Sequence, residues 1–180
     1  MTLDIHVPAG STGHDSLTVD ISADDAGWTY SGLRVAVLGA GESLALETGD
    51  YELLVLPLAG AATVETGGET HELAGRSGVF EEVTDSLYVP RRTSFVLTSA
   101  AGGRFALPAA IAVRDLPVRY LGRDQVRTDL RGAGDCSRQV NNYSLNNGVE
   151  TSHLLCCEVL TPGGNWSSYP AHKHDRKGAD

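Results

Sequence analysis

The sequence predicts an all-β fold of the barrel or sandwich type. Short apolar runs rich in β-branched residues recur along the chain, the first of them being "LRVAVL" at residues 33–38. Glycine and proline interrupt these runs about every 8 to 12 residues, which is the spacing of turns in β-sandwiches and barrels. No window keeps a capped 3.6-residue apolar period, so the sequence leaves room for only a short helix after Gly122.

The strands are predicted in chain order from the positions of the turn formers. Residues 42–73 are broken at Gly49-Asp50, at Pro57 and at Gly67-Gly68. The next runs are "SLYVPRRTSFVLTSA" at 86–100, with a turn at Pro90 to Arg92, and "GRFALPAAIAV" at 103–113. Each piece between breaks is too short for an ordinary helix and is therefore predicted as a strand.

Changes in composition divide the chain into four parts. Residues 1–19 are predicted to be a flexible N-terminal segment, and residues 20–113 the first β-domain. Residues 114–150 are polar, rich in arginine and broken by glycine, and they are predicted to be a connection with room for one strand. Residues 151–180 begin with "TSHLLCCEVL", which predicts a strand buried on both faces at the start of a second domain. About 30 residues are too few to close another barrel.

Charge and composition exclude several classes of function. The chain has 14 basic and 23 acidic residues, a formal charge of -9, which disfavours nucleic acid as a partner. No apolar stretch approaches the ~20 residues of a membrane span, and we expect a cytoplasmic protein without membrane contact. The three cysteines lack C-x-x-C spacing, so we expect no disulfide and no cysteine zinc site. Cys156 and Cys157 are predicted to be buried on opposite faces of a strand.

Near the end of the chain, His172 and His174 form the strongest metal-binding pattern. If "SYPAHKH" is extended, residues two apart point to the same side and both imidazoles can bind one ion. Imidazole suits zinc, manganese or iron. The alternative is that these are polar residues near a terminus, while His71 and His153 are interpreted as surface or strand-end residues.

Four ordered motifs extend the histidine pattern over most of the chain. They are "GDYELLVLPLAGAATVETGG", "GRSGVFEEVTDSLYVPRRT", "GDCSRQVNN" and "EVLTPGGNWSSYPAHKHD". From about Gly27 to His174 the sequence resembles the 5-deoxy-glucuronate isomerase family of bacterial myo-inositol catabolism. The resemblance implies a bicupin, with a first cupin at residues 20–113 that lacks a metal site and the start of a second cupin at residues 151–180. It also implies the aldose-ketose isomerisation of 5-deoxy-glucuronate to 5-dehydro-2-deoxy-gluconate.

By this resemblance, His172 and His174 correspond to the first two ligands of a divalent metal, zinc or manganese. The glutamate and the third histidine of the family have no counterpart among Asp175 to Asp180, so we expect the site to be incomplete in this chain. No residue can be assigned as the catalytic base. Arg138 is the candidate for binding the carboxylate of a sugar-acid substrate, because a guanidinium grips a carboxylate with two hydrogen bonds. The alternative for Arg138 is a structural ion pair or a solvated loop.

Three hypotheses therefore stand. The first is an isomerase of the named family, and the second is another sugar-acid enzyme such as the related ketol-isomerase of pectin breakdown. The third is a non-enzymatic cupin that binds a small acid or acts as an assembly module. We also expect a homo-oligomer, because the apolar run "LLCCEVL" invites pairing with another chain unless it folds back on the first barrel.

Overall fold

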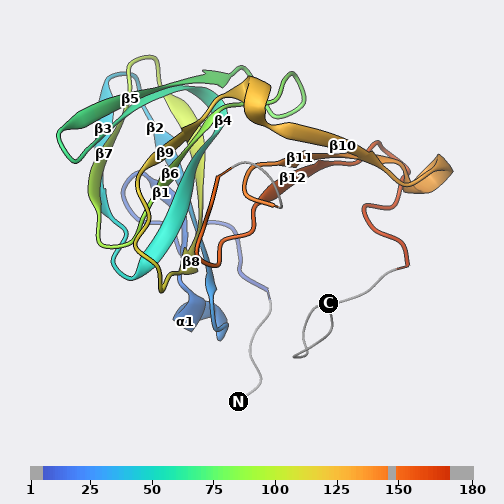
Figure 1. Cartoon of the computed structure of the whole chain (residues 1–180), viewed down its shortest axis with the longest axis horizontal. Helices are drawn as coiled ribbons and strands as arrows, with labels where there is room; N and C mark the ends of the chain where they lie inside the picture. The colour runs from blue at the N-terminus through green and yellow to red at the C-terminus, as the bar shows by residue number, and fades with distance from the viewer. Residues whose placement is uncertain (1–5, 146–148, 171–180) are drawn as a thin grey trace.

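A computed structural model of the chain describes residues 6–145 and 149–170 and consists mainly of β-strands (Figure 1). In chain order the elements are β1 (Leu17–Ile21), α1 (Ala23–Ala26), β2 (Ser31–Leu38), β3 (Glu42–Glu47), β4 (Tyr51–Thr66), β5 (Glu69–Arg76), β6 (Ser86–Val89), β7 (Ser94–Ser99), β8 (Gly103–Ile111), β9 (Arg119–Leu121), the 3-10 helix η1 (Arg123–Gln125), β10 (Arg127–Arg131), the 3-10 helix η2 (Gly134–Cys136), β11 (Arg138–Asn142) and β12 (Cys157–Leu160).

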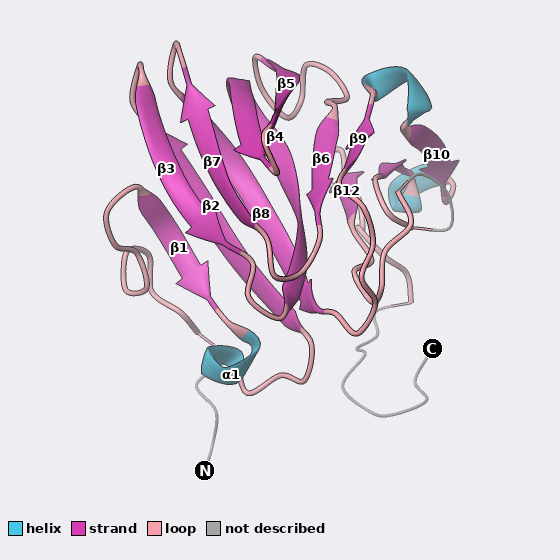
Figure 2. Cartoon of the chain, turned by 60° about the vertical axis from the view of Figure 1, so that its left-hand side comes forward, coloured by secondary structure: helices cyan, strands magenta, loops and turns pink. Residues whose placement is uncertain are grey.

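The first nine strands form a barrel in which β4 belongs to two layers. The first half of β4 pairs with β6 and β8, in the layer β1-β2-β8-β4-β6-β9. Its second half pairs with β5 and β7, and β7 in turn pairs with β3. In Figure 2, β1, β2, β3, β7 and β8 run at similar inclinations. The predicted all-β, cupin-type barrel or sandwich is confirmed.

Strand β4 changes layer at Gly60, where the backbone could not accommodate a side chain. Its φ of 91° lies in the left-handed region, and a Cβ there would stand 2.6 Å from the carbonyl oxygen of Gly102. Register shifts flank the bend on both sides, so β-bulges accommodate the change of direction.

The barrel interior is filled with apolar side chains. Alternation along β4 sends Leu53 and Val55 inward, where they join the residues Leu17, Ala36, Leu38, Ala62, Val64, Leu73, Leu87, Val89, Phe95, Leu97, Phe105 and Leu107. These buried side chains make the interior of the barrel its hydrophobic core.

A second core lies on the outer surface of the same layer. Leu54 and Leu56 of β4 point away from the interior and pack with Tyr88, Leu121, Val126, Tyr143, Val149, Leu154 and Cys156. The run "LLVLPL" at residues 53–58 is apolar without interruption because both faces of this strand are covered. Each fully buried leucine contributes ~1.5–3 kcal/mol relative to an exposed one. The chain after the barrel therefore returns to cover it.

The Glu52 carboxylate holds the returning chain against the barrel. Its carboxylate is fully buried, and it accepts hydrogen bonds from the amides of Ser152, His153 and Leu154 at 2.7, 2.6 and 2.7 Å. The Tyr88 hydroxyl donates the fourth, at 2.7 Å. Burial and the adjacent Glu52 carboxylate raise the pKa of Tyr88, which keeps this hydroxyl protonated as a donor.

Several predicted boundaries differ from the structure. The strand predicted in "TSHLLCCEVL" covers only Cys157–Leu160, because the amides just before it bond to Glu52 rather than to a sheet. Along β12, exposed and half-buried residues alternate, so the prediction of a strand buried on both faces was wrong. Cys156 is buried as predicted, whereas Cys157 is exposed.

The segments on either side of the predicted barrel also hold more structure than expected. Strand β1 begins at Leu17, inside the segment predicted to be flexible. The predicted connection 114–150 holds β9, β10 and β11 rather than one strand. Strands β10 and β11 were missed because, apart from Leu130 and Val140, all of their residues are polar or charged. The 3-10 helix η1 lies where a short helix was allowed, after Gly122. Within the described residues, no helix is long and apolar enough to cross a membrane.

We predict that Glu52→Gln lowers the free energy of unfolding by ~2–4 kcal/mol, because one oxygen becomes an amide group that cannot accept the buried N–H and O–H donors. Urea denaturation measures this loss. The exposed Glu47→Gln is the control and should change stability by less than ~0.5 kcal/mol. Equal losses in the two variants would contradict the anchoring role of Glu52.

The two adjacent cysteines should differ in reactivity. Burial is the main cause that raises the pKa of Cys156 to about 12, and the neighbouring Cys157 and Glu158 add to it. Its thiolate is therefore scarce at neutral pH. We expect iodoacetamide to label Cys157 at least ~10-fold faster than Cys156. Mass spectrometry of tryptic peptides over a labelling time course gives both rates, and similar rates would show that the returning chain does not cover Cys156.

Candidate functional site

Strands β10, β11 and β12 form a separate antiparallel sheet beside the barrel, as Figure 1 shows. The register joins Leu130 to Gln139 and Gln139 to Leu160 in one row across the sheet, and no bulge interrupts the ladder. Because side chains alternate between the two faces, one face carries Thr128, Gln139, Asn141 and Glu158, and the other carries Arg127, Asp129, Arg131, Arg138 and Asn142. We call the second set the arginine face.

The first face is attached to the barrel by a buried ion pair. Arg76, at the end of β5, has no exposed side-chain surface, and the Glu158 side chain is 13% exposed. Its guanidinium donates from Nη1 to Glu158 Oε2 at 2.9 Å and from Nη2 to Oε1 at 2.5 Å. Asn141 Nδ2 donates to Glu158 Oε2 at 3.0 Å. This bidentate arrangement fixes both the distance and the rotation of the sheet relative to the barrel.

The rest of the Arg76 guanidinium is bonded within the barrel. Its Nε donates to the carbonyl oxygen of Pro57 at 3.0 Å, and Nη1 also donates to that of Glu82 at 3.1 Å. Arg76 therefore joins the corner of β4, the loop after β5 and the second sheet. On this face of the sheet, the polar groups are largely satisfied by one another.

The arginine face is organised around Asp129. Arg127 Nε donates to Asp129 Oδ1 at 2.7 Å, and Arg131 Nη2 donates to Oδ2 at 3.1 Å. Asn142 Nδ2 donates to the same Oδ2 at 3.2 Å. Hydrogen bonds from Arg131 and Arg127 lower the pKa of Asp129, so this carboxylate stays ionised at neutral pH.

The sequence-predicted residues are placed as follows. His172 and His174 lie outside the described residues. Arg138 begins β11 and is half-buried, and its Nη1 donates to the carbonyl oxygen of Cys136 at 3.1 Å. Within residues 6–145 and 149–170, no carboxylate forms an ion pair with Arg138. The alternative of a structural ion pair therefore finds no partner in the described part of the chain.

Sequence reasoning missed the residues that hold the site in place. Glu52 is a single charge inside the apolar run "YELLVLPL", and a buried charge of this kind signals a buried partner. Arg76 and Glu158 are 82 residues apart, and nothing in the sequence pairs them. The local pattern could have flagged Glu52 but not the ion pair.

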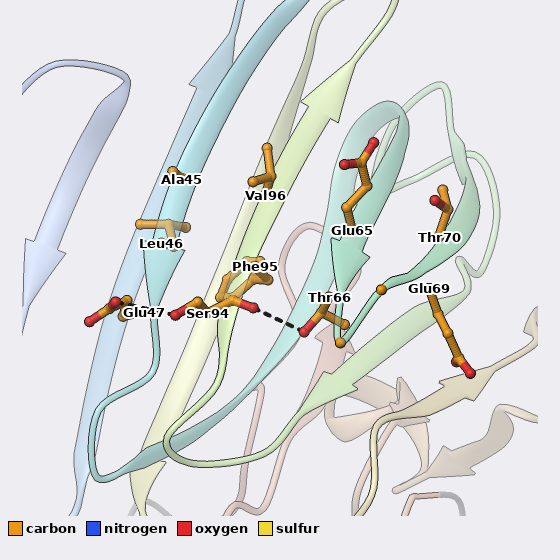
Figure 3. Close-up of a pocket in the computed structure, with 12 residues that line it drawn as sticks. Ala45, Leu46, Glu47, Glu65, Thr66, Glu69, Thr70, Ser94, Phe95 and Val96 are labelled. Carbon is orange, nitrogen blue, oxygen red and sulfur yellow. Dashed lines mark hydrogen bonds between the residues drawn. The ribbon is translucent and has the colours of Figure 1, made fainter.

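A cavity of about 640 Å³ opens at the ends of β3, β7, β4 and β5 (Figure 3). Three carboxylates, those of Glu47, Glu65 and Glu69, line it without a cationic side chain. A negatively charged ligand would be repelled from this position. The cavity therefore does not suit a sugar acid.

A second cavity, of about 590 Å³, lies between Phe80 and the end of the three-stranded sheet. Arg131, Arg138 and Gln139 contribute to its wall, together with the apolar Leu130 and Leu160. This position brings Arg138 next to a space of suitable size for a small molecule.

The side chains of the described residues do not form a metal site of their own. In the described part of the chain, no group of three or more His, Cys, Asp and Glu side chains could hold a metal ion. The described residues therefore do not fit a metal site, and the prediction of zinc or manganese depends entirely on His172 and His174.

An all-β barrel of cupin type, continued by a second sheet from the returning chain, is the class of protein that these features define. Residues 5–180 match the model of the KduI/IolB family, and the chain belongs to this family. The predicted resemblance is thereby confirmed.

The individual relatives agree with this assignment. The chain is 36% identical over 172 residues to the 5-deoxy-glucuronate isomerase of Geobacillus kaustophilus, and the match covers 94% of this chain and 62% of that protein. The corresponding protein of Bacillus subtilis strain 168 is 32% identical over 162 residues. The chain thus spans less than two thirds of the length of these relatives.

Solved structures support the same fold. An IolB-like protein of Salmonella typhimurium LT2 superimposes with a TM-score of 0.84 at 33% identity, covering 92% of this chain and 64% of that one. A putative glyoxylate-induced protein from Pseudomonas aeruginosa, at 10% identity and a TM-score of 0.52, shares the fold.

We predict that Arg76→Met lowers the free energy of unfolding by ~3–5 kcal/mol, because it leaves the Glu158 carboxylate buried without its partner. The double variant Arg76→Met with Glu158→Leu should recover part of this loss. The control is Arg92→Met, which removes an exposed pair with Asp50 and should cost less than ~1 kcal/mol. A double variant no more stable than Arg76→Met would contradict the direct pairing, as measured by urea denaturation.

Proposed function

We propose that the chain serves the aldose-ketose isomerisation of a sugar acid, converting 5-deoxy-D-glucuronate to 5-dehydro-2-deoxy-D-gluconate in myo-inositol catabolism. The observation that carries this proposal is membership of the KduI/IolB family, together with relatives named 5-deoxy-glucuronate isomerase. The half-buried Arg138, which has no carboxylate partner among the described residues, supports a negatively charged substrate.

The reaction moves a proton between two adjacent carbons. A base removes the proton from the carbon next to the aldehyde, the electrons shift to form an enediol, and a proton returns to the former aldehyde carbon. A divalent ion held by His172 and His174 would stabilise the negative charge on the enediol oxygens as a Lewis acid.

For this chain we assign one role in binding. Arg138 orients the substrate by donating two N–H groups to its carboxylate. The aldehyde end is then free to reach the reacting groups. The guanidinium is suited to this role because Nη1 is already held by the carbonyl oxygen of Cys136. A group held in this way loses less conformational freedom when the substrate binds.

The non-enzymatic alternative has one observation in its favour. In the described residues, no group of three or more His, Cys, Asp and Glu side chains could hold a metal ion. A sugar acid could then bind without being converted. Self-association is a further proposal, since Leu155 remains 69% exposed beside the returned strand.

The test is turnover of 5-deoxy-D-glucuronate by the 180-residue protein in D₂O with added Zn²⁺ or Mn²⁺, followed by proton NMR. If His172 and His174 suffice to hold the ion, the ketose forms and carries deuterium at the former aldehyde carbon. The double variant His172→Ala with His174→Ala should lower kcat/KM at least ~100-fold. Loss of a residue that only hydrogen-bonds to a metal ligand would have a smaller effect. His71→Ala is the matched control and should retain the activity.

One result would contradict the enzymatic proposal. If a full-length relative isomerises the substrate under the same conditions and this chain does not, with either metal, then the chain is a binding or assembly module. Size-exclusion chromatography with light scattering on the same sample reports its oligomeric state.

A further inference from the structure

One continuous apolar surface lies on the outer side of β1, β2 and β8. Because Ala36 and Phe105 point into the barrel, their neighbours along β2 and β8 point outward. The register arranges the outward apolar side chains in adjacent rows, which are Ile21, Leu33 and Pro108 in one row, Val19, Val35 and Ala106 in the next, and Val37 beyond them on β2. We call this set the β2 face. Its second row continues to Leu56 of β4, which belongs to the second core.

The returning chain covers only part of this surface. Leu56 is buried beneath it, whereas Leu33 and Val37 of the β2 face are each 39% exposed. A hollow of about 350 Å³ marks the border between the two parts, and Tyr30 and Leu155, which are 52% and 69% exposed, line part of it. The β2 face is thus the part of an existing apolar contact surface that the described residues leave open. An exposed apolar surface of this kind marks a site for protein association.

Charge lies at the two ends of the β2 face. Among the outward residues of β1, β2 and β8, Arg104 is the one charged side chain, and it lies opposite Val37 at one end. It is exposed, and no carboxylate forms an ion pair with it within residues 6–145 and 149–170. Asp24 lies beyond the other end, in α1, which follows β1 (Figure 2). It too is exposed, and no cation in the same residues pairs with it.

We propose that the β2 face binds the same face of a second copy of the chain, with the strands of the two copies antiparallel. A two-fold axis brings identical surfaces together, and two apolar sheet faces pack ~10 Å apart with interdigitated side chains. Every copy carries a formal charge of -9, so the centre of a contact between copies must be free of carboxylates. The β2 face meets this condition. The inference names the surface of the self-association proposed above and does not depend on the isomerase reaction.

Charge complementarity selects the orientation of the two copies. When the two-fold axis is perpendicular to the strands, Arg104 of one copy lies near Asp24 of the other, and this contact occurs twice. When the axis is parallel to the strands, Arg104 faces Arg104 and Asp24 faces Asp24. Opposite charges at the rim favour the first arrangement, and like charges disfavour the second.

The other exposed apolar surface fits a second copy less well. Phe80 and Leu130, which are 82% and 83% exposed, lie beside the cavity that Arg131 and Arg138 help to line. A second copy on that surface would bring its own two arginines toward these two. Like charges at a contact oppose association, so this surface does not favour a pair of identical chains.

Sedimentation velocity of the full 180-residue protein tests the proposal. We expect a dimer at ~100 µM, a concentration that fills an interface of micromolar affinity. Leu33→Glu places a carboxylate at the centre of the contact and should raise the dissociation constant at least ~100-fold. Leu130→Glu is the matched control, because it makes the same change at an exposed leucine outside the β2 face, and it should leave the dimer unchanged. If circular dichroism shows that Leu33→Glu does not fold, Val37→Glu replaces it, with the same expected loss.

An exchange of charges tests the orientation. Arg104→Glu and Asp24→Arg should each weaken the dimer by ~10-fold, because each places like charges together at the rim. The double variant Arg104→Glu with Asp24→Arg pairs the charges again with reversed sign. It should therefore return the dissociation constant to within ~3-fold of its original value.

Three results would overturn the inference. The first is a monomer at the same protein concentration. The second is a dimer that Leu130→Glu dissociates and Leu33→Glu does not, which would place the contact beside Phe80. The third is a double charge variant that associates no more tightly than either single variant. These measurements need no substrate, so a dimer without turnover contradicts only the enzymatic proposal. Turnover by a monomer contradicts only this inference.

Discussion

The burial of the Glu52 carboxylate determines where the chain after the barrel can lie. A buried ionised group is tolerated only when it is fully hydrogen-bonded, and the donors of Glu52 are three consecutive amides and one hydroxyl. Three of the four donors come from residues 152–154, about 100 positions along the chain. The returning segment must therefore cross the barrel at this position, and the second apolar core forms beneath it.

Two other carboxylates, those of Asp85 and Glu158, also hold together segments that are distant in sequence. Asp85 is buried and accepts from the amides of Ala74 and Gly75 and from the Tyr120 hydroxyl, which links β9 to β5. Glu158 pairs with Arg76 and joins β12 to it. Each contact links segments distant in sequence. On the face of the three-stranded sheet that carries Glu158, the polar side chains are hydrogen-bonded to one another and to Arg76. The opposite face keeps Arg138 without a carboxylate among the described residues, which makes it the candidate for binding the substrate.

Much of the barrel could be predicted from the sequence, because local signals define it. Turn formers at Gly49-Asp50, Pro57 and Gly67-Gly68 and alternating apolar positions do not depend on distant residues. The family could be predicted as well, from motifs that include "GDCSRQVNN". The three-stranded sheet could not, since its strands "RTDLR" and "RQVNN" are polar on both faces and take their form from pairing with each other and with Arg76. The role of Glu52 depends on a contact across the whole fold, which local patterns do not encode.

The central claim is that buried carboxylates make the barrel and the three-stranded sheet one cooperative unit. Native-state hydrogen exchange measures this directly, because each amide reports the free energy of the opening that exposes it. We predict that the β11-β12 amides and those of Ser152, His153 and Leu154 exchange with free energies close to those of the β4-β8 pair in the barrel. Exchange of the three-stranded sheet at a much lower free energy, while the barrel stays protected, would contradict the account.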